Sequence, residues 1–109
     1  TLVGVGAGES CVIERRPHGA HVLEGAQAAV NEWRSPGWRG RARGEDNPAR
    51  LDAIGRADGR MAPDFPWLRP PILNPNTRLV MTADPRSGAF IAQGWEADGP
   101  ATAPLEAVA

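Results

Sequence analysis

Five prolines crowd the stretch from Met61 to Pro75, and no other feature of the sequence restricts the fold as much. A proline donates no backbone hydrogen bond, and its ring clashes with the preceding helical turn, so this stretch can form neither a helix nor a central strand. We expect a semi-rigid connector over residues 61–76. The regular elements of the chain must then lie on either side of it.

Before the connector, short apolar runs alternate with turn residues. The runs 1–7 and 10–15 are apolar and flank a turn at Gly8-Glu9, which predicts an antiparallel hairpin. Shorter strands are expected at 21–23 and 27–30. An irregular stretch follows over residues 32–46, and so long a loop in a compact domain is uncommon unless it is functional or disordered.

One helix is expected just after this loop. Asp46 or Asn47 can cap it, and a proline suits its first turn. Leu51 and Ile54 lie three positions apart, so they would share its buried face. The helical pattern fades near Gly59.

After the connector, the runs 77–84 and 89–95 flank a Pro-Arg-Ser-Gly turn and predict a second hairpin. We expect extended coil from Ala97 onward. The fold class is therefore α+β, with mostly antiparallel strands and one helix. One helix covers only part of a sheet face, so the remaining apolar strand residues indicate that a further part of the molecule covers them.

Composition excludes several classes of function. The 109 residues include 12 basic and 13 acidic ones, and a net charge of −1 draws the chain neither to nucleic acid nor to a membrane surface. No apolar run approaches the roughly 20 residues of a membrane helix, and the first residues do not resemble a signal peptide. The single cysteine allows no internal disulfide and is typical of a cytoplasmic protein.

Few residues suggest chemistry by themselves. Cys11 lies within an apolar strand pattern without a neighbouring base, so we interpret it as structural. His18, His21 and Glu24 lack the further ligands and supporting partners of a zinc site. We expect no metal and no organic cofactor.

Thr1 opens one catalytic alternative. A threonine at a chain's N-terminus can act as a nucleophile because its own amine serves as the base. The chain would then be the processed product of a self-cleaving precursor, with Thr1 at the start of a strand.

The 32–46 loop carries Trp33, Trp38 and four arginines. Such a set can bind an anion or stack on single-stranded nucleic acid. Three acidic residues in the same stretch argue against nucleic acid. We favour the rim of a substrate pocket or a solvated loop, and we take Trp33 and Trp38 as candidate substrate-binding residues.

Four segments together resemble one enzyme family. They are SCVIER, AAVNEW, NPARLDAI and PPILNPNTRLVMTADPRSGAFIAQGWEADGPAT. They look like the C-terminal region of the isopenicillin-N acyltransferase-like branch of the N-terminal nucleophile (Ntn) hydrolases, which cleave or transfer acyl groups at linear amide bonds. The resemblance spans nearly the whole chain, residues 1–109.

The resemblance implies a fold, and it implies that the nucleophile lies outside this chain. The family fold is an αββα sandwich of two stacked antiparallel sheets, to which this segment would contribute strands and one helix. The nucleophile is a cysteine exposed by autoproteolysis, and it lies upstream of the segments seen here. The chain would therefore be inactive alone, with the remainder of the enzyme as its partner and a small-molecule amide as substrate.

Two site residues carry over from the resemblance. Asn31 in AAVNEW matches an asparagine that helps to form the oxyanion hole, and Arg50 in NPAR matches an arginine near the site. The family motif often continues with histidine or tyrosine, whereas Glu32-Trp33 follow here, so the substrate is not implied. From the residues alone, two other functions remain open: a small non-catalytic protein-interaction domain, and the Thr1 nucleophile.

Overall fold

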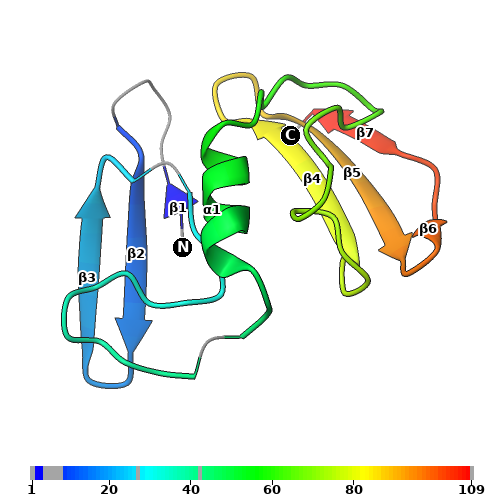
Figure 1. Cartoon of the computed structure of the whole chain (residues 1–109). Coiled ribbons are helices and arrows are strands. Elements are labelled where there is room, and N and C mark those ends of the chain that lie inside the picture. The colour runs from blue at the N-terminus through cyan, green and yellow to red at the C-terminus, as the bar shows by residue number, and fades with distance from the viewer. Residues whose placement is uncertain (1, 4–8, 27, 42, 109) are drawn as a thin grey trace. The chain divides into compact units, whose positions relative to one another are not determined.

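A computed structural model of the chain describes residues 2–3, 9–26, 28–41 and 43–108. The chain forms two compact units, residues 1–56 and 57–109. Each unit contains one antiparallel sheet, and the first unit also contains the helix (Figure 1). The structure therefore has the mostly antiparallel α+β character that the sequence predicts.

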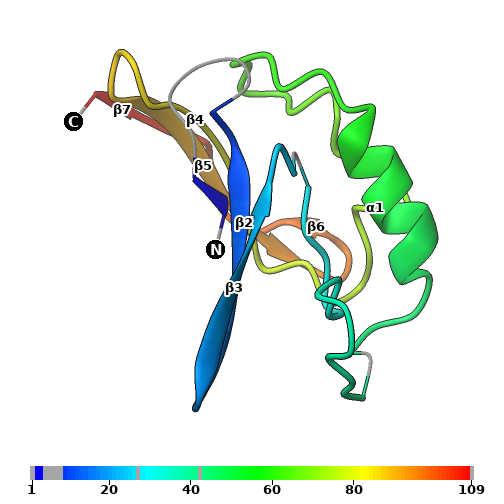
Figure 2. The same ribbon diagram turned by 90° about the vertical axis from the view of Figure 1, so that its left-hand side faces the viewer.

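The sheet of the first unit has three strands in the order β1-β2-β3, namely β1 (Leu2–Val3), β2 (Cys11–Arg16) and β3 (Gly19–Glu24). The pairing of Leu2 with Val12 confirms the first hairpin in its described part. Strands β2 and β3 form a second, longer hairpin (Figure 2). The strand expected at 27–30 is wrong for residues 28–30, which form none, and Gln27 lies outside the described residues.

Strand β2 alternates in burial. Val12 and Glu14 are buried, whereas Cys11 and Ile13 are half-buried. Because side chains two apart point to the same face of a strand, the Glu14 carboxylate shares the buried face with Val12. A buried carboxylate requires partners, and the 32–46 loop supplies them.

Helix α1 (Asn47–Gly55) begins where the sequence predicts and ends earlier than expected. Asp46 is the N-cap residue, but its left-handed backbone (φ 56) leaves it without a capping hydrogen bond from its side chain, so the expected cap is absent. Leu51 and Ile54 are only half-buried, and the buried residue of the helix is Asn47. The helix is thus fixed mainly at its first turn.

The sheet of the second unit consists of β4 (Leu79–Asp84), β5 (Ala89–Glu96), β6 (Gly99–Pro100) and β7 (Leu105–Val108). Strand β5 pairs with all the others, antiparallel in each case. The 77–84 and 89–95 hairpin is confirmed, with Leu79 opposite Gly94. The coil expected from Ala97 is wrong, because β6 and β7 lie there.

The proline-rich stretch contains neither helix nor strand, as expected, but it does more than connect. Its Phe65 is buried together with Val80 and Ile91, and Trp67 packs against this core. The Trp67 indole Nε1 donates a hydrogen bond to the Thr82 hydroxyl at 3.1 Å. The stretch therefore covers one face of its own sheet.

The opposite face of this sheet is apolar and uncovered within the second unit. Leu79, Met81 and Leu105 are 68%, 55% and 60% exposed. Their register places Met81 beside Ala92 and Ala92 beside Leu105, so they form one patch. None of the described residues forms a helix with the length and hydrophobicity that a membrane span requires.

Candidate functional site

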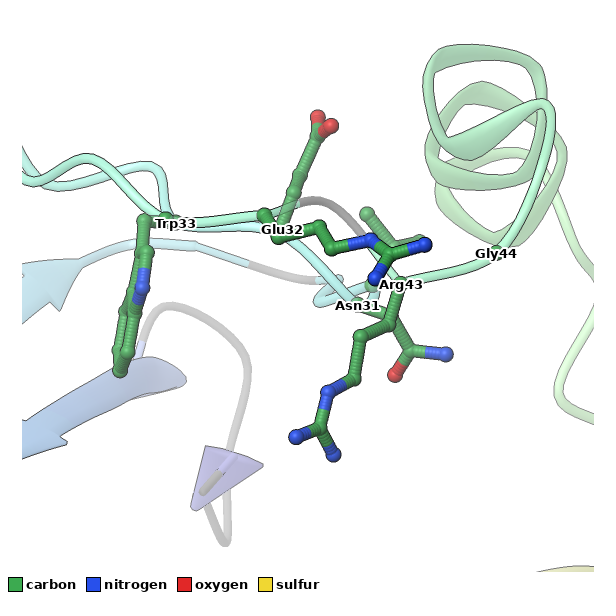
Figure 3. A pocket seen from close by; sticks show the side chains of 8 residues that line it. Asn31, Glu32, Trp33, Arg43 and Gly44 are labelled. Carbon is green, nitrogen blue, oxygen red and sulfur yellow. The ribbon is translucent and has the colours of Figure 1, made fainter.

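A hollow opens in the first unit where the 32–46 loop folds back on itself. The backbone N–H of Arg43 donates to the carbonyl of Asn31 at 3.1 Å and holds the two ends of the loop together. We call this feature the loop hollow (Figure 3). It is lined by Val30, Asn31, Glu32, Trp33, Gly40, Arg41, Arg43 and Gly44.

The buried carboxylate of Glu14 fixes the loop to strand β2. Its Oε1 accepts the backbone N–H of Arg34 and its Oε2 accepts that of Ser35, both at 2.8 Å. The Ser35 hydroxyl also donates to Oε2. The hydroxyl lies 2.9 Å from His21 Nδ1 on β3. We call Glu14, Ser35 and His21 the loop anchor.

The loop anchor contains a carboxylate, a serine and a histidine, yet its order does not suit nucleophilic catalysis. In a catalytic triad the histidine lies between the serine and the carboxylate and removes the serine proton. Here Ser35 lies in the middle, donates its proton to Glu14 and leaves His21 Nδ1 to act as a donor. Ser35 is also only 4% exposed. The loop anchor is therefore structural.

The carboxylate of Glu14 remains ionised despite its burial. Burial raises the pKa of Glu14, but hydrogen bonds from the Ser35 hydroxyl and from the backbone of Arg34 and Ser35, with the nearby His21, together hold its pKa below the ordinary value. Hydrogen bonds to a charged acceptor favour the charged form. The ionised group can thus accept three donors from the loop at once.

The two tryptophans of the loop have different environments. Trp33 lines the loop hollow and is 39% exposed. Trp38 is not among the lining residues; it meets Trp33 edge to face at 5.2 Å, and the Arg16 guanidinium lies 4.0 Å from its ring centre. A Cβ on Gly40 would come within 2.9 Å of the Trp33 indole nitrogen, so the loop passes tightly over Trp33.

The side chains of the two site residues taken from the sequence, Asn31 and Arg50, both approach Gly44. A Cβ on Gly44 would lie 3.4 Å from Arg50 Nη1, 3.6 Å from Asn47 Oδ1 and 3.9 Å from Asn31 Nδ2. Gly44 has a positive φ of 95°, which favours glycine. The arrangement brings the first turn of α1 beside the start of the loop.

Two buried polar atoms beside Gly44 lack a hydrogen-bond partner among the described residues. They are Asn47 Oδ1 and Arg50 Nε. Asn47 is only 3% exposed, and its amide nitrogen makes a long 3.5 Å bond to the carbonyl of Arg43. Unsatisfied buried polar groups are uncommon in native proteins and often mark functional positions.

In the described part of the chain, the arginines around the loop hollow have no ion-pair partner. Among the described residues, Asp52 of α1 pairs with Arg56, the residue that follows the helix, and no ion pair involves Arg41, Arg43 or Arg50. Figure 3 shows the Asn31 and Arg43 side chains extending to one side of the loop and the Glu32 carboxylate to the other. The site can therefore present hydrogen-bond donors to a negatively charged group.

The other sequence candidates lie elsewhere. Cys11 is half-buried in β2, and His18 is exposed in the β2–β3 turn. In the described ranges, no three histidine, cysteine or acidic side chains gather as metal ligands would. Thr1 lies outside the described residues.

Neither Glu14 nor Ser35 is predicted as a site residue from the sequence, and Asn47 is predicted only as a possible helix cap. One signal was present for Glu14, because a glutamate two positions after Val12 in an apolar strand must share the buried face. Nothing local marked Ser35 as its partner, since the two lie 21 residues apart.

The chain was also compared with known proteins. No protein-family model matches it, and no match was found among curated proteins or among solved structures.

Proposed function

We propose that this chain is the C-terminal segment of a cytoplasmic cysteine Ntn amide hydrolase or acyltransferase acting on linear amide bonds. The nucleophile belongs to the remainder of the enzyme, and no metal or organic cofactor takes part. One observation carries the proposal: Asn31, which matches an oxyanion-hole asparagine in sequence, lines the loop hollow, and both Asn31 and Arg50 approach Gly44. The segment resemblance supplies the reaction class.

Asn31 would stabilise the oxyanion of the tetrahedral intermediate through its side-chain amide. Its backbone carbonyl is held by Arg43, so the side chain starts from a fixed point. Within the described part of the chain, no acceptor engages Asn31 Nδ2, so both of its hydrogens remain available to a ligand. A preorganised donor of this kind contributes roughly 3 kcal/mol to transition-state stabilisation.

The reaction would follow the logic of a self-activated cysteine. The thiolate of the upstream cysteine attacks the amide carbonyl, with its own α-amine accepting the thiol proton. Collapse of the tetrahedral intermediate breaks the C–N bond, and the leaving amine takes up a proton. Water or an acceptor amine then attacks the thioester, which releases the acyl product and regenerates the thiol.

A second function is favoured by the uncovered face of the second sheet. Leu79 and Met81 on β4 and Leu105 on β7 form an exposed apolar patch, with Ala92 of β5 between Met81 and Leu105. Such a patch is typical of a surface that meets another protein or another part of the same protein. A non-catalytic interaction domain is thus the alternative to the enzyme, and Thr1 as the nucleophile of a processed chain is a third.

The test uses the natural polypeptide that contains this chain. It is assayed against a panel of acyl p-nitroanilides, with Asn31→Ala compared with Asn76→Ala, an exposed asparagine of the second unit. We expect Asn31→Ala to lower kcat by about 100-fold or more with a smaller change in KM, and Asn76→Ala to change neither. Absence of hydrolysis by the natural polypeptide, or equal rates for the two variants, would refute the proposal.

A further inference from the structure

We propose that the loop hollow binds the oxyanion group of a small molecule, a carboxylate or a phosphate, through the guanidinium groups of Arg41 and Arg43 and the side-chain amide of Asn31. This inference does not rest on the proposed catalytic role, because binding needs no nucleophile. It identifies the chemistry of the ligand that the hollow accepts.

The charge at the loop hollow is the first argument. Its lining contains two arginines and one glutamate, and the Glu32 carboxylate points to the opposite side of the loop from Arg43 (Figure 3). Over the described residues, neither Arg41 nor Arg43 forms an ion pair or a side-chain hydrogen bond. Two guanidinium groups without a carboxylate partner favour a ligand that carries the missing negative charge.

Several other arginines of the chain are already engaged. Arg56 pairs with Asp52, and Arg16 lies over the Trp38 ring. Arg34 donates to the carbonyl of Ala28, and Arg78 donates to two nearby carbonyls. Arg41 and Arg43 differ from these because they line a concavity and lack such partners among the described residues.

The geometry of the loop supplies the second argument. The hydrogen bond from the Arg43 backbone to the Asn31 carbonyl places these two residues side by side, and their side chains extend to the same side (Figure 3). A guanidinium and an amide N–H₂ in this arrangement can each donate to a different oxygen of one oxyanion. The fixed turn reduces the conformational entropy that binding must otherwise cost.

The surroundings of Gly44 supply the third argument. Helix α1 begins three residues after Gly44, at Asn47, and its first turn contains no acidic residue. The N-cap residue Asp46 is itself acidic, so its charge partly offsets the positive end of the helix dipole. The Arg50 guanidinium approaches the same glycine, with its Nε buried and without a partner among the described residues. The guanidinium of Arg50 therefore raises the positive potential at this end of the loop hollow.

The test is a titration of the full chain followed by ¹H–¹⁵N NMR, with sodium acetate and sodium phosphate as separate probes and sodium chloride at matched ionic strength as the reference. We expect saturable shifts of the Asn31 side-chain amide, the Trp33 indole N–H and the Gly44 backbone N–H. The stronger of the two probes identifies the ligand as a carboxylate or a phosphate. Chloride should cause only small, non-saturating shifts.

Matched variants locate the binding. Arg43→Gln should weaken the binding of the stronger probe by about tenfold, the loss expected for one charge-assisted hydrogen bond. Arg39→Gln removes an exposed arginine of the same loop that does not line the hollow, so it should leave the affinity unchanged. If Arg43→Gln does not fold, Arg41→Gln takes its place in the comparison with Arg39→Gln.

Several results would overturn the inference. They are an equal effect of Arg39→Gln and Arg43→Gln, no saturation with either probe, or shifts that chloride reproduces. The outcome is separable from the amide hydrolase proposal. If the probe binds but the natural polypeptide hydrolyses no amide, the oxyanion site stands and the amide hydrolase proposal fails. If hydrolysis depends on Asn31 but no probe binds, the amide hydrolase proposal stands and the oxyanion site fails.

Discussion

Replacing Glu14 by glutamine should release the 32–46 loop from strand β2. The carboxylate accepts three loop donors, two backbone N–H groups at 2.8 Å and the Ser35 hydroxyl. In Glu14→Gln one side-chain oxygen remains an acceptor, but the new N–H₂ group faces a donor on the other side. The variant therefore loses its charge and at least one buried hydrogen bond.

The magnitude follows from burial. Glu14 is 8% exposed and Ser35 is 4% exposed, so water cannot replace the lost partner easily. A hydrogen bond to a charged group contributes about 1.5–3 kcal/mol, and an unsatisfied buried donor costs about 1–3 kcal/mol. We expect the free energy of unfolding of the first unit to fall by about 2–4 kcal/mol.

Urea unfolding of the full chain measures this change, with hydrogen exchange at the Arg34 and Ser35 amides as the local readout. The matched control is Glu24→Gln, which removes an exposed glutamate from β3 of the same hairpin. The control should change the stability by less than about 0.5 kcal/mol. Equal stability of the two variants, with the Ser35 amide still protected in Glu14→Gln, would refute the reasoning.

The acid dependence of stability should change in the same variant. Because the pKa of folded Glu14 lies below the ordinary value of 4.5, its contribution is complete above that pH and is lost as the pH falls through the folded pKa. The wild-type chain should therefore lose stability on acidification more steeply than Glu14→Gln. Parallel pH profiles for the two proteins would contradict this assignment.

Two further predictions concern packing and backbone conformation. Ile91→Ala opens the core beside Phe65 and should lower the free energy of unfolding, measured with urea, by about 2–5 kcal/mol. Leu79→Ala, at a side chain that is 68% exposed, should lower it by less than about 0.5 kcal/mol. The reverse order would show that the other face of the sheet is the covered one. Gly44→Ala forces a side chain into a positive-φ position 3.4 Å from Arg50 and should destabilise by about 1–3 kcal/mol. Gly55→Ala, with open space around its Cβ at the end of α1, should leave thermal stability the same or slightly higher.

Local pattern predicted the parts of the fold that depend on neighbouring residues. The β4–β5 hairpin, the start of α1 and the absence of helix or strand around the prolines follow from turn chemistry and apolar alternation within a few residues. The pairing of β7 with the far edge of β5 joins segments that the sequence does not mark as partners, so the tail was predicted as coil. Asp46 failed as a side-chain cap because its backbone adopts a left-handed conformation.

The candidate site was predictable to a similar extent. The sequence identified the 32–46 loop, and Asn31 and Arg50 came from the segment resemblance; in the structure the side chains of the last two both approach Gly44. The loop anchor could not be predicted, because it depends on contacts between Glu14, His21 and Ser35 across the hairpin and the loop. The loop anchor is what gives this long polar loop a defined shape, and no local sequence pattern marks it.

The measurement that tests the proposed function most directly is mass spectrometry of the natural polypeptide after an acid quench during turnover of an acyl p-nitroanilide. The account predicts one acyl group on an N-terminal cysteine that lies outside these 109 residues, together with its loss on treatment with hydroxylamine. An acyl group on Thr1, or no covalent intermediate while the substrate is hydrolysed, would contradict it.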